Sequence, residues 1–160
     1  MNNIEETIKS TLLNLDVKYE WIQVDPEFAD TQAFTDKYGY RLDQSGNTII
    51  VGSKRGEKKF SACIVLGIHK LDVNKKVKSL MATSRVSFAT PEDTMLITGM
   101  LIGGVTPFGI PESIPFYIDA KVMESEFLIV GGGSRSGKIK IHPKELLKIP
   151  NAQIIEGLSL

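Results

Sequence analysis

Two glycine-rich segments constrain this chain more than any other feature of its sequence. Residues 103–111 read GGVTPFGIP and residues 131–138 read GGGSRSGK, and each segment follows an apolar run. Glycine loses more backbone entropy on folding than any other residue. A run of three is therefore expected where φ is positive or where another group comes close to the backbone. We expect a pocket walled by main-chain amides rather than by large side chains.

Length and composition predict one domain with a core of its own. The chain has 160 residues, 42% of them hydrophobic, so we expect a single domain over residues 1–160 that needs no disulfide or metal. The one cysteine, Cys63, cannot form an internal disulfide, which is typical of a reducing compartment. The polar start MNNIEETIKS is unlike a secretory signal, and no apolar stretch reaches ~20 residues. These features predict a cytoplasmic protein without membrane contact.

The charges balance over the whole chain but are unevenly distributed along it. Net charge is zero, yet residues 1–47 hold nine acidic and four basic residues, whereas residues 48–78 hold eight basic and two acidic ones. A basic face of this kind can bind an RNA backbone, or it can simply be the solvated surface of a hairpin and a helix. Charge alone favours the second interpretation.

Periodicity and turn residues predict a mixture of helices and strands without regular alternation. A charged tip at residues 53–57 between two apolar runs indicates a β-hairpin. We expect an α+β domain, with a mixed or antiparallel sheet and flanking helices. Helices are expected at residues 2–14, 28–38, 73–81, 91–98 and 143–148, and strands at 19–24, 48–51, 60–68, 116–119, 127–130, 138–141 and 153–155.

The familiar catalytic motifs are absent from the sequence. The second glycine segment ends in Gly137-Lys138 like a P-loop, but the residues that follow alternate as a strand, whereas a P-loop leads into a helix. His69 and His142 stand in no metal-ligand spacing, and nothing near Cys63 would activate a thiolate. We therefore expect no metal, no cofactor and no catalytic triad.

The glycine segments, taken in order with their neighbours, resemble a known family. GGVTPFGIP, a strand ending in Asp119, and FLIVGGGSRSGKIKIHPKELLKI are similar to the YbaK/prolyl-tRNA-synthetase-associated domain family. The resemblance extends to residues 28–39, 47–51 and 74–81 and covers roughly residues 20–155. It implies a YbaK-like α+β fold. It also implies hydrolysis of the ester of mischarged tRNA, by a free-standing protein or as an editing insertion of a prolyl-tRNA synthetase.

The resemblance also implies where the substrate binds. The aminoacyl ester of the tRNA 3′ end would lie between the two glycine loops, with a positioned water or a group of the substrate assisting hydrolysis. The amides of Gly103 and Gly104 would act on the ester carbonyl, with Asn47 as a third catalytic residue. Eight further residues would bind substrate, the last two through terminal phosphates: Thr106, Pro107, Gly131, Gly132, Gly133, Ser134, Arg135 and Lys138.

One position departs from the family pattern. The family usually has a lysine at the start of the strand that here begins with Asn47, and the neighbours Gly46 and Thr48 supply none. An asparagine amide forms hydrogen bonds but carries no charge.

Three functions therefore stay open. The first is a trans-editing deacylase for prolyl-, cysteinyl- or alanyl-type substrates, with aminoacyl-tRNA as partner and a synthetase as a further candidate partner. The second is a weak or inactive relative that binds tRNA or an aminoacyl ligand. The third is an α+β domain with an unrelated partner surface. Oligomeric state is left open.

Overall fold

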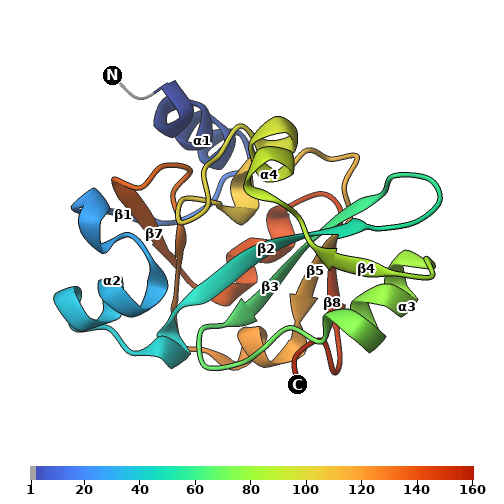
Figure 1. Ribbon diagram of the computed structural model, residues 1–160. Coiled ribbons are helices and arrows are strands. Elements are labelled where there is room, and N and C mark those ends of the chain that lie inside the picture. The colour runs from blue at the N-terminus through green and yellow to red at the C-terminus, as the bar shows by residue number, and fades with distance from the viewer. Residues whose placement is uncertain (1–2) are drawn as a thin grey trace.

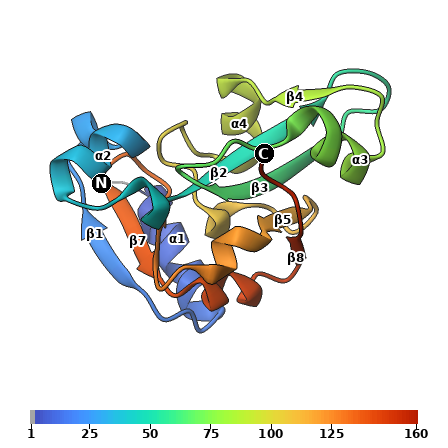
Figure 2. The same cartoon turned by 90° about the horizontal axis from the view of Figure 1, so that it is seen from below.

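Two β-sheets and the helices around them form the protein. The computed structural model describes residues 3–160. Its larger sheet has the strand order β4-β2-β3-β5-β8, and its smaller sheet has the order β1-β7-β6 (Figure 1). Seen from below, the β1–β7 pair stands apart from the larger sheet, with α2 above it (Figure 2). The α+β class with mixed sheets is confirmed.

The elements fall close to the predicted ranges. The helices are α1 (Asn3–Asn14), α2 (Thr31–Tyr38), α3 (Lys78–Met81) and α4 (Pro91–Thr98). Short helical turns are η1 (Pro26–Phe28), η2 (Leu42–Gln44), η3 (Val73–Val77), η4 (Pro107–Gly109), η5 (Ala120–Glu124) and η6 (Pro143–Lys148). The strands are β1 (Glu20–Gln23), β2 (Gly46–Ser53), β3 (Phe60–Leu66), β4 (Val86–Phe88), β5 (Phe116–Asp119), β6 (Leu128–Gly131), β7 (Gly137–Ile141) and β8 (Ala152–Ile155).

Two local predictions were wrong and have simple physical reasons. The helix predicted from residue 28 begins only at Thr31, because Asp30 is extended (ψ 146°) and separates it from the turn η1. Strand β4 was not predicted, since three residues are too few to show a period. The helices predicted to end at residues 38 and 98 do end there, and each is followed by a glycine, Gly39 or Gly99, whose φ of 80° or 73° is left-handed.

The larger sheet is mixed because a hairpin is extended by parallel strands. β2 and β3 pair antiparallel from Gly46↔Leu66 to Gly52↔Phe60, as the charged turn between them predicted. β3 then pairs parallel with β5, and β5 pairs parallel with β8. The main core includes Ile64 and Phe116 of this sheet and Ile139 of the smaller one, so one apolar cluster joins both sheets.

Helix α1 closes one side of that core. Its buried residues Ile8 and Leu12 are four apart and therefore lie on one face of the helix. The same helix holds the second glycine loop. A Cβ at Gly133 would lie 2.7 Å from Ile8, and Ser134 Oγ donates a hydrogen bond to Glu5.

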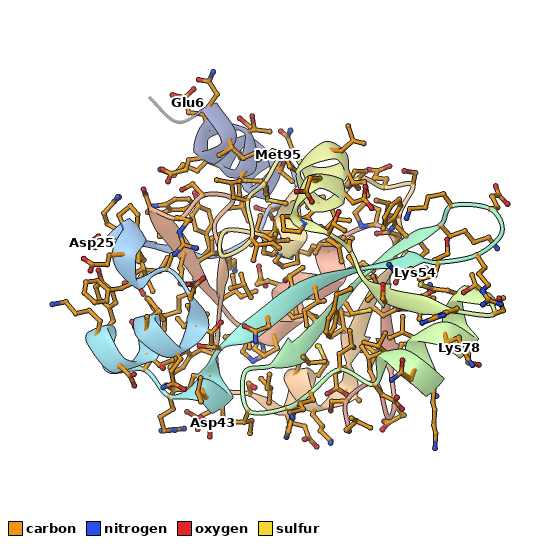
Figure 3. The ribbon with its side chains drawn as sticks, viewed as in Figure 1. Glu6, Asp25, Asp43, Lys54, Lys78 and Met95 are labelled. Carbon is orange, nitrogen blue, oxygen red and sulfur yellow. The ribbon has the colours of Figure 1, made fainter. Side chains whose placement is uncertain are left out.

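Acidic and basic residues that lie in different parts of the sequence also lie in different parts of the structure. Asp25 and Asp43 lie on the side of α2 and η2, whereas Lys54 and Lys78 lie at the opposite end with the β2–β3 turn and α3 (Figure 3). Two lysines of the basic stretch, Lys54 and Lys78, thus lie at one end of the molecule, away from Asp25 and Asp43.

We predict that Leu12→Ala destabilises the protein by about 2–5 kcal/mol, because Leu12 is fully buried and its truncation leaves a cavity. Leu13→Ala is the matched control: Leu13 is 79% exposed, and its loss should change stability by less than about 0.5 kcal/mol. Urea denaturation measures both. Equal losses for the two variants would contradict the packing of α1.

Candidate functional site

A cavity of about 410 Å³ lies where the two sheets, α2 and α4 meet, within the range of small-molecule sites. The residues that line the cavity come from six segments of the chain. They are Ala29, Asp30 and Thr31; Ser45 to Ile50; Phe88, Ala89 and Thr94; Ile102, Gly103 and Val105; Ile129 and Gly131; and Lys138.

The two glycine loops meet beside this cavity, backbone against backbone. A Cβ at Gly131 would lie 2.2 Å from the Val105 carbonyl oxygen, and one at Gly104 would lie 2.8 Å from the backbone of Ser134. The N–H of Gly133 donates to the Gly104 carbonyl at 2.7 Å. No residue with a side chain fits at Gly104 or Gly131 without moving the opposite loop, which explains the glycines.

This close contact changes how the pocket wall is built. The N–H groups of Gly104, Gly132 and Gly133 donate to the carbonyls of Leu101, Gly137 and Gly104, so they are engaged within the protein. Apolar side chains such as Ile50, Ile129 and the 60% exposed Phe88 line much of the cavity instead. The sequence predicted a wall of main-chain amides. The structure instead shows a wall made largely of apolar side chains, with most of the loop amides engaged within the protein.

Gly103 differs from the other loop glycines. It lines the cavity, its φ is 95°, and within residues 3–160 its N–H has no hydrogen-bond partner. A Cβ there would collide with Arg135, 2.0 Å from its Nη1. The Gly103 N–H is thus an unengaged main-chain donor in the cavity lining, next to the Arg135 guanidinium.

Arg135 ties three segments together around the pocket. Its Nη1 donates to Asp30 Oδ1 at 3.1 Å and to the Ile102 carbonyl at 3.3 Å, and its Nη2 donates to the Pro26 carbonyl at 3.1 Å. The hydrogen bond from Arg135 holds the pKa of Asp30 below its ordinary value. The pair therefore stays charged and joins the second glycine loop to the start of α2.

Of the eleven site residues predicted from the sequence, four line the cavity: Asn47, Gly103, Gly131 and Lys138. The others lie in the loops behind it. Thr106 and Pro107 are buried, and the Thr106 hydroxyl accepts from Phe108 N at the start of η4. Ser134 bonds to α1.

Three polar side chains of the cavity were not singled out in the sequence. Thr31 Oγ1 donates to Asn47 Oδ1 at 2.6 Å, which leaves the Asn47 amide nitrogen without a partner within the described residues. Ser45 Oγ and Thr48 Oγ1 are buried and likewise have none among residues 3–160. Buried hydroxyls are normally hydrogen-bonded, so these two groups leave the cavity with hydrogen-bonding capacity that water or a polar ligand can use. No spacing in the sequence marks them, because Thr48 lies in a strand of ordinary pattern and Ser45 directly precedes that strand.

Lys138 is the only cation among the described residues that line the cavity, and it is 8% exposed. Its Nζ lies 5.1 Å from the centre of the Phe34 ring and has no ion pair or hydrogen bond within residues 3–160. Burial lowers the pKa of Lys138 to about 8, an effect that Asp30 opposes and Arg135 reinforces.

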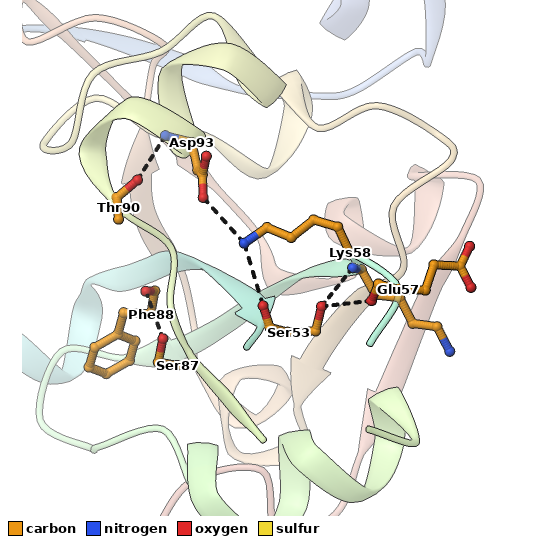
Figure 4. A network of polar contacts seen from close by, with 8 residues as sticks. Ser53, Glu57, Lys58, Ser87, Phe88, Thr90 and Asp93 are labelled. Carbon is orange, nitrogen blue, oxygen red and sulfur yellow. Dashed lines mark hydrogen bonds and ion pairs between the residues drawn. The ribbon is translucent and has the colours of Figure 1, made fainter. Parts of the chain in front are cut away.

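The outer wall at Phe88 and Ala89 is positioned by α4 (Figure 4). Thr90 Oγ1 accepts from Asp93 N at 3.0 Å and caps this helix. Lys58 Nζ lies 3.6 Å from Asp93 Oδ2 and 3.4 Å from the Ser53 carbonyl, which joins the helix to the β2–β3 turn.

Cys63 takes no part in the site. It is fully buried in β3, and burial raises the pKa of its thiol to about 12, so no thiolate forms near neutral pH. Cys63 belongs to the apolar core instead.

Comparison with known proteins identifies the family. The sequence pattern of the aminoacyl-tRNA editing domain matches residues 25–149, which include every residue that lines the cavity. The chain belongs to this family, as the glycine segments predicted.

Two relatives are similar in sequence. A protein of Enterococcus faecalis named EbsC, described as a candidate Cys-tRNA(Pro)/Cys-tRNA(Cys) deacylase, is 27% identical over 108 residues, 68% of this chain and 63% of EbsC. The chain thus matches somewhat less than two thirds of that relative. YwhH of Bacillus subtilis, which is uncharacterised, is 29% identical over 114 residues, 66% of this chain and 71% of YwhH.

Solved structures share the fold. One is described as a candidate trans-editing enzyme for prolyl-tRNA synthetase; its TM-score is 0.83 at 22% identity, over 98% of this chain and 97% of that one. Another, the hypothetical protein APE2540, has a TM-score of 0.84 at 20% identity, over 96% and 99%. Within residues 3–160, every helix is too short or too polar to cross a lipid bilayer.

We predict that Gly131→Ala destabilises the protein by about 1–3 kcal/mol, because the added methyl group collides with the rigid Val105 carbonyl. Gly52→Ala is the control. The nearest atom there, at 3.0 Å, belongs to the Phe60 side chain rather than to the backbone, so a smaller shift relieves the contact. Urea denaturation of both variants measures the difference. A Gly131→Ala protein as stable as Gly52→Ala would contradict the contact between the loops.

Lys138→Met should stabilise the protein at neutral pH by up to roughly 3 kcal/mol, since each pKa unit between 10.5 and about 8 corresponds to ~1.4 kcal/mol. Below pH 8 the folded and unfolded states are both protonated, and only the folded state buries the charge. Between pH 8 and 10.5 the folded state loses its proton first, so wild-type stability rises relative to the variant. Urea denaturation at pH 7 and pH 9.5 checks this. A gap that does not depend on pH would refute it.

Proposed function

We propose that this protein hydrolyses the ester bond of mischarged aminoacyl-tRNA in trans. The observation that carries the proposal is the cavity beside the junction of the two glycine loops, within the part of the chain that matches the editing-domain family. The substrates to expect first are cysteinyl-, alanyl- and prolyl-tRNA. The descriptions of EbsC and of the trans-editing structure support the first choice.

The mechanism relies on polar groups that hold the ester rather than on a side-chain nucleophile. The Gly103 N–H would donate to the ester carbonyl and to the oxyanion that forms when water attacks; one such donor is typically worth ~10²–10³ in rate. The Asn47 amide nitrogen, with its carbonyl fixed by Thr31, would orient the water or the ribose. Gly131, where the second loop meets the first, would form the facing wall.

The decisive experiment is deacylation of a panel of mischarged tRNAs by the purified protein. Gly103→Ala should lower the rate by at least ~10²-fold, because the methyl group strains the backbone and displaces Arg135 from the loop. Gly56→Ala is a matched control: it is also a glycine of positive φ (72°), but it lies in the β2–β3 turn outside the cavity. Release of no amino acid above the spontaneous rate, across the panel, would exclude the enzyme.

A second candidate is a binding module with a weak or inactive site, and Asn47 is the observation that favours it. The two candidates differ in their response to Asn47→Lys. A large gain in hydrolysis would indicate that the natural site is degenerate. A loss would indicate that Asn47 works as it stands, through the amide nitrogen left unengaged beside Thr31.

A further inference from the structure

The ammonium group of Lys138 is buried in the cavity wall without a counter-charge of its own. Taking a charge out of water is costly unless an opposite charge or hydrogen bonds replace the hydration. The charged groups that act on Lys138 are Asp30 and Arg135, but both carboxylate oxygens of Asp30 already accept from Arg135. The neighbours from α2, β1 and β6 carry no charge: Phe34, Ile22 and Gly131. The cavity wall therefore holds one unbalanced positive charge.

Two buried hydroxyl groups line the same cavity as this ammonium group. Ser45 Oγ and Thr48 Oγ1 have no hydrogen-bond partner among residues 3–160. Ser45 forms a β-bridge with Ile129 of β6, and Gly131, two residues further along β6, pairs with Lys138 of β7. Only β6 thus separates the backbones of Ser45 and Lys138, and two strand spacings amount to about 10 Å. The long lysine side chain spans much of that distance, so one ligand group can contact both residues.

A cation with hydroxyl donors near it suits a carboxylate in the side chain of the bound acyl group. An ionised carboxylate accepts from an ammonium group and from a hydroxyl at the same time. The side chain of alanine or proline does neither, and it would displace water from Lys138 without replacing the lost hydration. The α-ammonium group is common to all aminoacyl esters, so the side chain is what distinguishes them here.

We propose that the cavity prefers acyl groups with an acidic side chain, aspartyl or glutamyl, whose carboxylate pairs with Lys138 and accepts from Ser45. The inference rests on the proposed function in taking an aminoacyl ester as the ligand, and it narrows the class of that ester. Lys138 is then a specificity-determining residue that acts on the amino acid rather than on the nucleotide. Arg135 has no such role, because its guanidinium already bonds Asp30 and two carbonyls.

Calorimetry with stable amides of 3′-amino-3′-deoxyadenosine tests the preference directly. The α-carboxyl of L-aspartate, of its neutral isostere L-asparagine or of L-alanine is joined to the 3′-amino group, and none of these probes carries a phosphate. At pH 7 the aspartyl amide should bind on the order of 10- to 100-fold more tightly than the asparaginyl amide.

The pH dependence on the wild-type protein gives a second measurement that needs no variant. The pKa of free Lys138 is about 8, so the group is about half protonated at pH 8, and a bound carboxylate keeps it protonated. Binding of the aspartyl amide at pH 8 should therefore take up roughly half a proton more than binding of the asparaginyl amide. The preference for the aspartyl amide should fall as the pH rises above 8.

Lys138→Met should remove the preference and the extra proton uptake, so that the aspartyl and asparaginyl amides bind about equally. Ser45→Ala should lower the preference by several-fold and keep the uptake. Lys140→Met is the matched control. It removes a lysine two residues along the same strand, whose Nζ lies over Phe127 outside the cavity, and it should leave both quantities unchanged.

Failure of this inference can be told from failure of the proposed function. A Lys138-dependent preference for the aspartyl amide without any deacylation would support the inference and refute the enzyme. Deacylation of cysteinyl-, alanyl- or prolyl-tRNA without a preference for the aspartyl amide would refute the inference alone. A preference that survives Lys138→Met would also overturn it, as would an effect of Lys138→Met that appears only with ligands that carry a phosphate. If the wild-type protein binds none of the amides and releases no amino acid, both proposals fail.

Discussion

The contact between the two glycine loops is the constraint on which the rest of the site depends. Gly131 lies against the Val105 carbonyl, and Gly133 donates to the carbonyl of Gly104. This junction fixes the end of β6 against the segment that follows α4. It thereby fixes Gly103 and Gly131, which both line the cavity, relative to each other. The glycines are needed first because they allow the two backbones to pack closely. They affect ligand binding through that packing.

The wall of the cavity contains polar groups that are buried without hydrogen-bond or charge partners. Two buried hydroxyls without partners and a desolvated ammonium group all lie in its wall within the described residues. Each destabilises the empty protein, whereas the apolar cluster that joins the two sheets stabilises it. Such a concentration of unsatisfied groups is typical of binding sites. A bound ligand can supply the hydrogen bonds and the opposite charge that these groups lack in the free protein.

The sequence predicted the parts of this molecule that local chemistry determines. Pro91 at the start of α4, Gly99 at its end and the charged turn of the β2–β3 hairpin all act on neighbouring residues, and each lies where it was expected. The paired glycine motifs likewise led to the correct family. The composition of the site was less predictable. Lys138 packs against Phe34, more than a hundred residues away, and the two unpartnered hydroxyls lie in and just before a strand of unremarkable pattern. The Asp30–Arg135 pair could not be foreseen from either segment alone.

The parallel pairing of β5 with β8 bears on how the chain folds as it is synthesised. β3 and β5 are neighbours in the sheet, and within residues 3–160 the outer edge of β5 pairs only with residues 152–155. A ribosome makes the chain from its amino end, so the apolar strand Phe116–Asp119 leaves the exit tunnel well before its outer partner does. During that interval an open strand edge faces the crowded cell, and it can pair with a second nascent chain. The risk of such mispairing therefore arises during translation. Slow elongation between residues 119 and 155 would prolong the exposure of this strand edge.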